Sequence, residues 1–266
     1  MNHEKVSLLV DELQSRGQYS FTREEILRKS GQSIRAVRRA LERMQQKGRI
    51  ALVSRGFYVI IPLEYREGRI LPAEWFIHQM MGFLKLPYYV GLLSAAAIHG
   101  AAHQKPQEFQ VLVNKQLRPV HVNGLRIHFV MKNNLKITSG IIQTKTETGY
   151  IQVSGPELTA LDLMKYPRIS GGLDNIATVL SELGEKIRPD ELLLVAREEK
   201  SLVYVQRLGY LLDYLDFESR AESLASWLSA QKPNQVLLDP AHPRGKSTFN
   251  KKWRLFENLS IEVEHL

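Results

Sequence analysis

The chain has 266 residues, of which 44% are hydrophobic and 24% charged, a composition typical of a folded globular protein and not of a disordered one. It contains no cysteine, which excludes disulfides, thiolate nucleophiles and cysteine-ligated metal centres. The most apolar long stretch, residues 86–102, is too short and too interrupted by Pro, Gly, Ser and His to span a membrane. Residues 1–5 lead directly into an amphipathic segment and do not resemble a signal peptide, so we expect a cytoplasmic protein with no membrane partner.

The positive charge is concentrated at the N-terminus. The net charge is +8, and residues 1–62 hold twelve Lys/Arg against six Asp/Glu, a net charge of +6, so the other 204 residues contribute only +2. This asymmetry is expected if the N-terminal part binds a polyanion such as DNA.

Three helices are predicted in this basic part. Apolar residues at helical spacing predict the first over about residues 5–16. Thr22 and Glu25 have the spacing of a capping box at the start of a second helix over 23–30. After a tight turn, Ser33 is predicted to cap a third helix that runs to about residue 47.

Two short strands, residues 49–53 and 57–61, are predicted to follow and to be joined by a tight turn over 54–56. Three helices followed by a hairpin is the element order of a winged helix-turn-helix, and the turn between helices two and three has the length that this motif requires. We therefore predict a winged helix-turn-helix DNA-binding domain over residues 1–62.

On a helical wheel, the third predicted helix has an apolar side and a basic side. Ile34, Val37, Leu41 and Met44 form the apolar side and are expected to be buried. The N-terminal half of such a helix enters the major groove, where side chains reach base edges. The predicted DNA-binding residues are Ser33, Arg35, Arg38, Arg39, Arg43, Lys47, Arg49 and Arg55.

These residues have different expected roles. Arg35 and Arg39 are best placed to read bases, and a bidentate arginine–guanine pair contributes about 1–3 kcal/mol of discrimination. Arg55 lies at the tip of the predicted wing, where it contacts the DNA backbone or the minor groove. Phosphate contacts are expected from Arg38, Arg43, Lys47 and Arg49. The alternative interpretations are an ordinary solvated surface and a winged helix that only docks another protein.

Beyond a connector over residues 63–72, the pattern is mixed. Helices are predicted over about 73–84, 87–98, 156–165, 173–184, 189–198, 202–215 and 221–230. Strands are predicted over 107–114, 120–129, 150–153, 235–238 and 261–263, with Asn123-Gly124 as the turn of a hairpin. Ser154 and Glu157 have capping-box spacing. The predicted fold class is therefore α+β, with the winged helix-turn-helix followed by a larger mixed α+β domain over residues 73–266.

No catalytic, metal or cofactor site is predicted. The chain has no glycine-rich phosphate loop, nucleophile elbow or His-Glu-x-x-His motif. His99 and His103 have a spacing compatible with a metal, but Gly100 lies between them and no acidic residue is close in sequence. Glu157 and Asp162 resemble a carboxylate pair, but helix capping and a structural hydrogen bond explain them. We therefore expect a protein that is not an enzyme.

A second basic stretch covers residues 242–246 and 251–254. Its five Lys/Arg and Trp253 are compatible with binding a nucleic-acid backbone or an acidic partner. The interpretation that we favour is a basic loop leading into a terminal strand, with Trp253 packed in the core.

Several segments together resemble one protein family. They are Tyr88 to Gly100 (YYVGLLSAAAIHG), Ser154 to Leu163 (SGPELTALDL), Gly171 to Asn175 (GGLDN), Arg207 to Leu212 (RLGYLL), and Leu238 to Pro240 with Trp253-Arg254. In this order, after a winged helix, they resemble the AbiEi-type antitoxins, the regulatory halves of abortive-infection toxin–antitoxin pairs.

The resemblance implies a function that composition does not. Such antitoxins repress their own operon by binding inverted repeats in the promoter DNA, and they neutralise a toxin similar to nucleotidyltransferases, directly or functionally. The second domain is linked to neutralisation, and no short motif identifies the residues responsible. Two alternatives remain open: a ligand-responsive repressor unrelated to a toxin, and a nucleic-acid-directed enzyme such as a nuclease.

Overall fold

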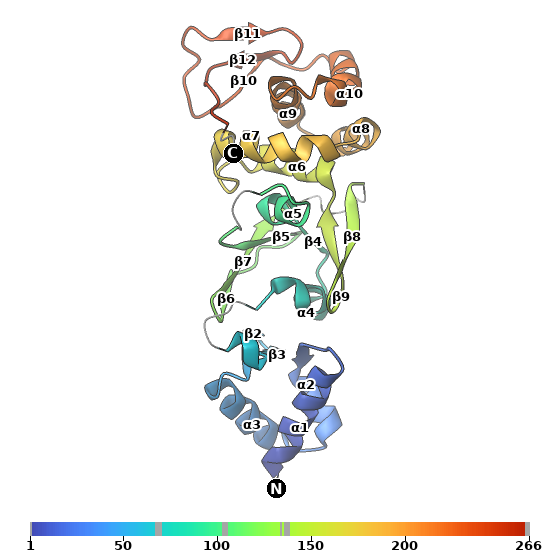
Figure 1. Ribbon diagram of the computed structural model, residues 1–266, viewed down its shortest axis with the longest axis vertical. Helices are drawn as coiled ribbons and strands as arrows, with labels where there is room; N and C mark the ends of the chain where they lie inside the picture. The colour runs from blue at the N-terminus through green and yellow to red at the C-terminus, as the bar shows by residue number, and fades with distance from the viewer. Residues whose placement is uncertain (1, 67–70, 103–105, 134, 136–138, 264–266) are drawn as a thin grey trace. The chain divides into compact units, whose positions relative to one another are not determined.

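The computed structural model describes residues 2–66, 71–102, 106–133, 135 and 139–263 (Figure 1). It confirms a mixed α+β fold. Contacts divide the chain into two compact units: unit 1 comprises residues 1–89, 107–135 and 143–152, and unit 2 comprises 90–106, 136–142 and 153–266. The predicted division into a domain over 1–62, a connector over 63–72 and a domain over 73–266 stays a prediction.

The N-terminal part of unit 1 contains three helices and a small sheet. The elements are α1 (Asn2–Ser15), β1 (Ser20–Thr22), α2 (Arg23–Ser30), α3 (Ile34–Gln46), β2 (Ile50–Ser54) and β3 (Phe57–Ile60). The strand order is β1-β3-β2, with antiparallel pairing throughout. The three helices and the hairpin are those predicted, whereas β1 was not predicted because three residues are too few to show a period of two.

The core of these helices follows the predicted periodicity with one exception. Val6 and Val10 of α1 pack with Val37 and Leu41 of α3 in one buried cluster. The prediction that Ile34 is buried was wrong, because its side chain is 69% exposed. Ile34 is the first residue of α3, and the buried side of the helix begins one turn later, where Val37 is followed by Ala40, Leu41 and Met44.

The remainder of unit 1 is built on a six-stranded sheet, in which β4, β8 and β9 each contain residues of both units. The strands are β4 (Tyr88–Val90), β5 (Phe109–Val113), β6 (Val120–Val122), β7 (Leu125–Met131), β8 (Ile141–Thr146) and β9 (Gly149–Ser154), in the order β6-β7-β5-β4-β9-β8. Asn123 and Gly124 both have positive φ, 45° and 77°, which confirms the predicted tight hairpin turn between β6 and β7.

A short helical segment precedes this sheet. It consists of the 3₁₀ turn η2 (Ala73–Trp75) and α4 (Ile77–Leu84). Trp75 contacts Tyr19 with 4.6 Å between ring centroids, and the ring centroids of Phe83 and Phe57 are 5.6 Å apart, so aromatic contacts join this segment to the N-terminal sheet.

The predicted helix over 87–98 was wrong for its first residues. Tyr88–Val90 form a buried strand, because β-branched and aromatic residues fit a paired strand and Val90 pairs with Val153.

Unit 2 consists of helices and a small C-terminal sheet. The helices are α5 (Leu92–Ile98), α6 (Pro156–Lys165), α7 (Gly172–Leu183), α8 (Pro189–Glu198), α9 (Leu202–Tyr214) and α10 (Glu218–Ala230). The strands are β10 (Val236–Leu237), β11 (Thr248–Asn250) and β12 (Leu255–Glu257), with β12 in the middle. The strand predicted over 261–263 is wrong, since these residues have no regular secondary structure.

The C-terminal sheet is anchored to α9 through Trp253. This side chain is fully buried, and its Nε1 donates a hydrogen bond of 2.7 Å to Asp213. The interpretation of Trp253 as a core residue is confirmed.

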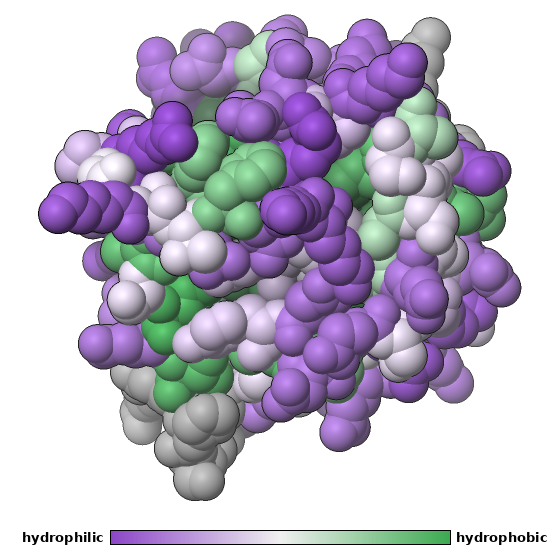
Figure 2. Space-filling model, turned by 90° about the horizontal axis from the view of Figure 1, so that it is seen from above, coloured by the Kyte–Doolittle hydropathy of each residue, from purple (hydrophilic) through white to green (hydrophobic). Residues whose placement is uncertain are grey.

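On the face that Figure 2 shows, hydrophilic side chains cover most of the surface, and hydrophobic side chains form only small separate areas.

Gly209 of α9 provides the space for this indole ring. A Cβ at position 209 would overlap the ring of Trp253, so we expect Gly209→Ala to lower the free energy of unfolding by about 1–3 kcal/mol through overpacking. Urea unfolding followed by circular dichroism measures the change. Gly82→Ala is the matched control, because nothing lies within 4 Å of the added Cβ and alanine is the better helix former. Equal stability of Gly209→Ala and the wild type would contradict the packing described.

Candidate nucleic-acid interface

Side-chain caps define the starts of α2 and α3. Thr22 caps α2 by accepting a 3.0 Å hydrogen bond from the backbone N–H of Glu25, and Ser33 caps α3 by accepting one of 3.3 Å from the backbone N–H of Ala36. Both predicted caps are confirmed, although the Glu25 carboxylate accepts from Lys29 and does not complete the capping box. Ser33 is exposed but already accepts a bond within the helix. Its hydroxyl therefore fixes the first turn of α3.

Arg35 and Arg39 lie on the exposed side of α3, opposite the buried stripe. Among the residues that the structure describes, neither guanidinium has an ion-pair partner. Each therefore keeps its full set of donors available for an external acceptor. Ile34, the first residue of α3, is also exposed, at 69%. The wheel missed Ile34, and only its position at the first residue of the helix indicated exposure.

Three further predicted residues are also exposed on or just after α3: Arg38, Arg43 and Lys47. Arg38 donates a 2.8 Å hydrogen bond to Glu42, and this carboxylate raises the pKa of Arg38 above its ordinary value. Side chains with 73% and 51% exposure form this pair, so it is weak and readily exchanged for another acceptor. Lys47 is the C-cap residue, where a positive charge is favourable.

Arg49 and Arg55 have different surroundings. Arg55 is exposed in the turn between β2 and β3, at the tip of the hairpin. Arg49 lies just before β2 and donates a 2.7 Å hydrogen bond to Ser7 and a second to the carboxylate of Asp11. Its guanidinium is thus bound to α1, which gives Arg49 a structural function in the described residues.

The contact between Arg49 and Asp11 predicts a coupled loss of stability. We expect Arg49→Gln to lower the free energy of unfolding by about 1 kcal/mol, because the pair is only partly shielded from solvent. A double-mutant cycle with Asp11→Asn measures the pairwise part, which we expect at about 0.5–1 kcal/mol. Additive single effects would show that the two side chains do not interact in solution.

The residues considered for metal or acid–base chemistry have structural partners. The Nε2 of His99 lies 2.7 Å from the carbonyl oxygen of Ser154, and His103 lies outside the described residues. Glu157 is buried and accepts a 2.9 Å hydrogen bond from the backbone N–H of Arg188, the N-cap of α8. Within the described ranges, no three metal-binding side chains form a group. Over those same ranges, no helix has the length and apolar character needed to cross a bilayer.

Comparison with known families identifies a central segment of the chain. Residues 89–214 match the model of the family described as the AbiEi antitoxin C-terminal domain. This segment is therefore similar to the C-terminal domain of the AbiEi antitoxins, which confirms the resemblance seen in the sequence.

The fold of this chain is also found in a solved structure. The crystal structure of the RV2827C protein from Mycobacterium tuberculosis is similar with a TM-score of 0.70 and 16% sequence identity. The similarity covers 95% of this chain and 91% of that one, so nearly the whole fold is shared. No curated protein matches the chain at a significant level.

Two of the segments that carry the AbiEi resemblance meet in unit 2. Val90 pairs with Val153, and the Ser154 hydroxyl lies 2.7 Å from that of Thr159. The predicted capping box at Ser154 is wrong, because Gly155 is the N-cap of α6 and no side chain caps this helix. Ser154 is buried at the end of β9, where its hydroxyl bonds Thr159 and the carbonyl oxygen of Val90. These segments therefore have structural functions in joining β4, α5, β9 and α6.

Proposed function

We propose that the protein is a DNA-binding antitoxin that represses its own operon and neutralises a nucleotidyltransferase-like toxin. The observation that carries the DNA-binding part is the exposed arginine side of α3, with Arg35 and Arg39 free of ion pairs among the described residues. The match of residues 89–214 to the AbiEi antitoxin C-terminal domain supports the antitoxin part. Residues 1–62 act in this proposal as the winged helix-turn-helix, and residues 73–266 as the neutralisation domain.

In this proposal, α3 is the recognition helix and lies in the major groove of promoter DNA that contains inverted repeats. Arg35 and Arg39 donate paired hydrogen bonds to guanines, and the exposed Ile34 packs against a thymine methyl group. Arg38, Arg43 and Lys47 bind phosphates on either side of the groove. Arg55, in the hairpin turn that forms the wing, contacts the DNA backbone or the minor groove.

Neutralisation is assigned to the larger domain because the family match lies there. The proposed toxin partner is a nucleotidyltransferase-like protein, antagonised by direct contact or functionally through its target. Neither route requires this chain to be an enzyme. The carboxylates and histidine that were considered for catalysis have structural partners, as the contacts of Glu157 and His99 illustrate.

Removing Arg39 tests the recognition surface. We expect Arg39→Ala to weaken specific binding to the DNA upstream of the gene by about 1–3 kcal/mol, because a bidentate base contact is lost. Fluorescence anisotropy with this duplex and a scrambled competitor measures the change, and thermal unfolding checks that stability is kept. Arg197→Ala is the control, since it removes the same charge from an exposed position on α8. Wild-type affinity of Arg39→Ala would refute the placement of the reading surface.

A phosphate contact has a different signature from a base contact. We expect Lys47→Gln to weaken binding to the promoter duplex and to an unrelated duplex by the same factor. We also expect it to reduce the slope of the logarithm of the binding constant against the logarithm of the salt concentration by about 1. Anisotropy titrations at several salt concentrations give this slope for both duplexes. An unchanged slope would remove Lys47 from the proposed set of phosphate contacts.

A further inference from the structure

A basic pocket lies at the end of unit 2 between α10 and the loop that joins β11 to β12. Its volume is about 450 Å³, within the range of about 300–1,000 Å³ for small-molecule sites. It is lined by Leu228, Ser229, Lys232, Pro233, Lys251, Lys252 and Arg254. Four of these seven residues are basic and none is acidic. The pocket is remote in sequence from the α3 residues of the proposed DNA contact.

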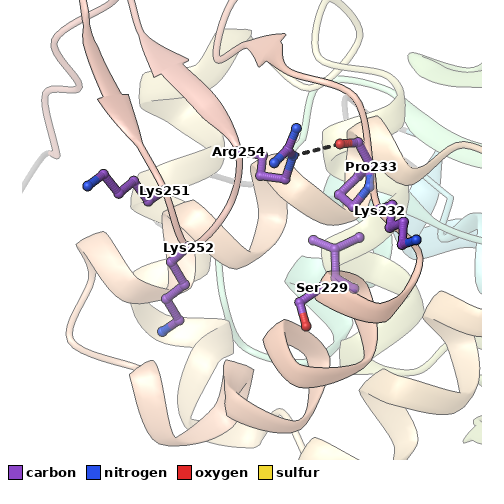
Figure 3. A pocket seen from close by; sticks show the side chains of 7 residues that line it. Ser229, Lys232, Pro233, Lys251, Lys252 and Arg254 are labelled. Carbon is purple, nitrogen blue, oxygen red and sulfur yellow. Dashed lines mark hydrogen bonds between the residues drawn. The ribbon is translucent and has the colours of Figure 1, made fainter.

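A buried amide holds the two walls of this pocket together. Gln206 of α9 is 1% exposed, and its Nε2 donates to the carbonyl oxygens of Asn234 at 2.9 Å and Trp253 at 3.0 Å. Arg254 also crosses between the walls, because its Nε donates a 2.7 Å hydrogen bond to the carbonyl oxygen of Pro233 (Figure 3). The backbone around the pocket is therefore fixed from inside the core.

The cations of this pocket are mostly uncompensated. Lys252 forms an ion pair with Asp213 at 2.7 Å. Lys232, Lys251 and Arg254 have no acidic partner in the part of the chain that the structure describes. Figure 3 shows Lys232 and Lys251 on opposite sides of Arg254, with their side chains directed away from each other. All of them line the same pocket, so an anion bound there is attracted by several positive charges.

The end of α10 does not account for these charges. Helix C-terminal carbonyls attract cations, but the carbonyl oxygens of Leu228 and Ser229 already accept backbone N–H groups of Gln231 and Lys232, at 3.0 and 3.2 Å. Lys232 and Arg254 also have left-handed backbones, with φ of 50° and 52°. Glycine adopts this conformation at lower energy, so the chain places basic side chains here at some conformational expense.

We propose that this pocket binds the di- or triphosphate group of a small molecule. Lys232, Lys251 and Arg254 supply the charge, whereas the hydroxyl of Ser229 already donates to the carbonyl oxygen of Ser226 at 3.0 Å. No aromatic residue lines the pocket, and Trp253 is fully buried, so a nucleobase would find no surface on which to stack. The site therefore recognises phosphate groups and not a base. Its concave shape fits a compact polyphosphate better than the backbone of a duplex.

Isothermal titration calorimetry of the full chain with inorganic triphosphate, in magnesium-free buffer, tests this site. We expect saturable binding of one triphosphate per chain. Lys232→Gln with Lys251→Gln should weaken it by about tenfold or more, equal to about 1.4 kcal/mol, because two of the three free cations are lost. These side chains are exposed and make no other described contact, so the variant should keep its thermal stability.

The control variant is Lys200→Gln with Lys246→Gln, which removes the same charge from exposed positions of unit 2 outside the pocket. Its affinity for triphosphate should equal that of the wild type. Absence of saturable binding to the wild type, or an equal loss in both variants, would overturn the proposal. A second titration measures binding of the promoter duplex, and the pocket variant should bind this duplex with the affinity of the wild type. If the pocket variant binds the duplex more weakly, and triphosphate does not compete with the duplex for the wild-type protein, the pocket binds nucleic-acid phosphates. The small-molecule assignment is then wrong.

Discussion

The apolar stripe of α3 determines where every basic side chain of that helix points. Val37, Ala40, Leu41 and Met44 are buried against the other N-terminal helices, and rotation of the helix would expose this stripe to water. Burying a large aliphatic side chain contributes about 1.5–3 kcal/mol, which greatly exceeds the benefit of any one exposed ion pair. The direction of Arg35 and Arg39 is therefore a consequence of core packing, and their chemistry is available only because the opposite face is apolar.

Helical periodicity carried most of what the sequence predicted about the fold. The three N-terminal helices, the hairpin at Asn123-Gly124 and the helices of unit 2 were predicted because their signals are local. The strand at Tyr88–Val90 was not, since its partner at Val153 lies more than sixty residues away. Short strands have weak local patterns, and tertiary pairing decides them. Ile34 shows the same limit within a helix, because the wheel gives a direction but not where the core ends.

The position of the candidate interface was predictable from the sequence, but the hydrogen-bond and ion-pair partners of its basic side chains were not. Arg39 and Arg49 both belong to the one set of DNA-binding residues predicted from the sequence, yet Arg49 is bound by Ser7 and Asp11 of α1. That contact joins residues about forty positions apart, which no local pattern contains. The interpretation of Trp253 as a core residue was confirmed for a simpler reason, that a large aromatic ring in a short terminal segment is most stable when buried.

Pairing, more than exposure, separates the basic residues of this chain by function. Arg49 and Lys252 lie beside carboxylates that use their charge within the fold, and such cations gain little from an external anion. Arg35, Arg39, Lys232 and Lys251 have no such partner among the described residues, although the chain holds 28 acidic residues that could provide one. Two separate groups of uncompensated cations, one on a convex helix and one in a pocket, differ in the shape of the anion that they fit. The helix suits the groove of a duplex, whereas the pocket suits a compact phosphate group.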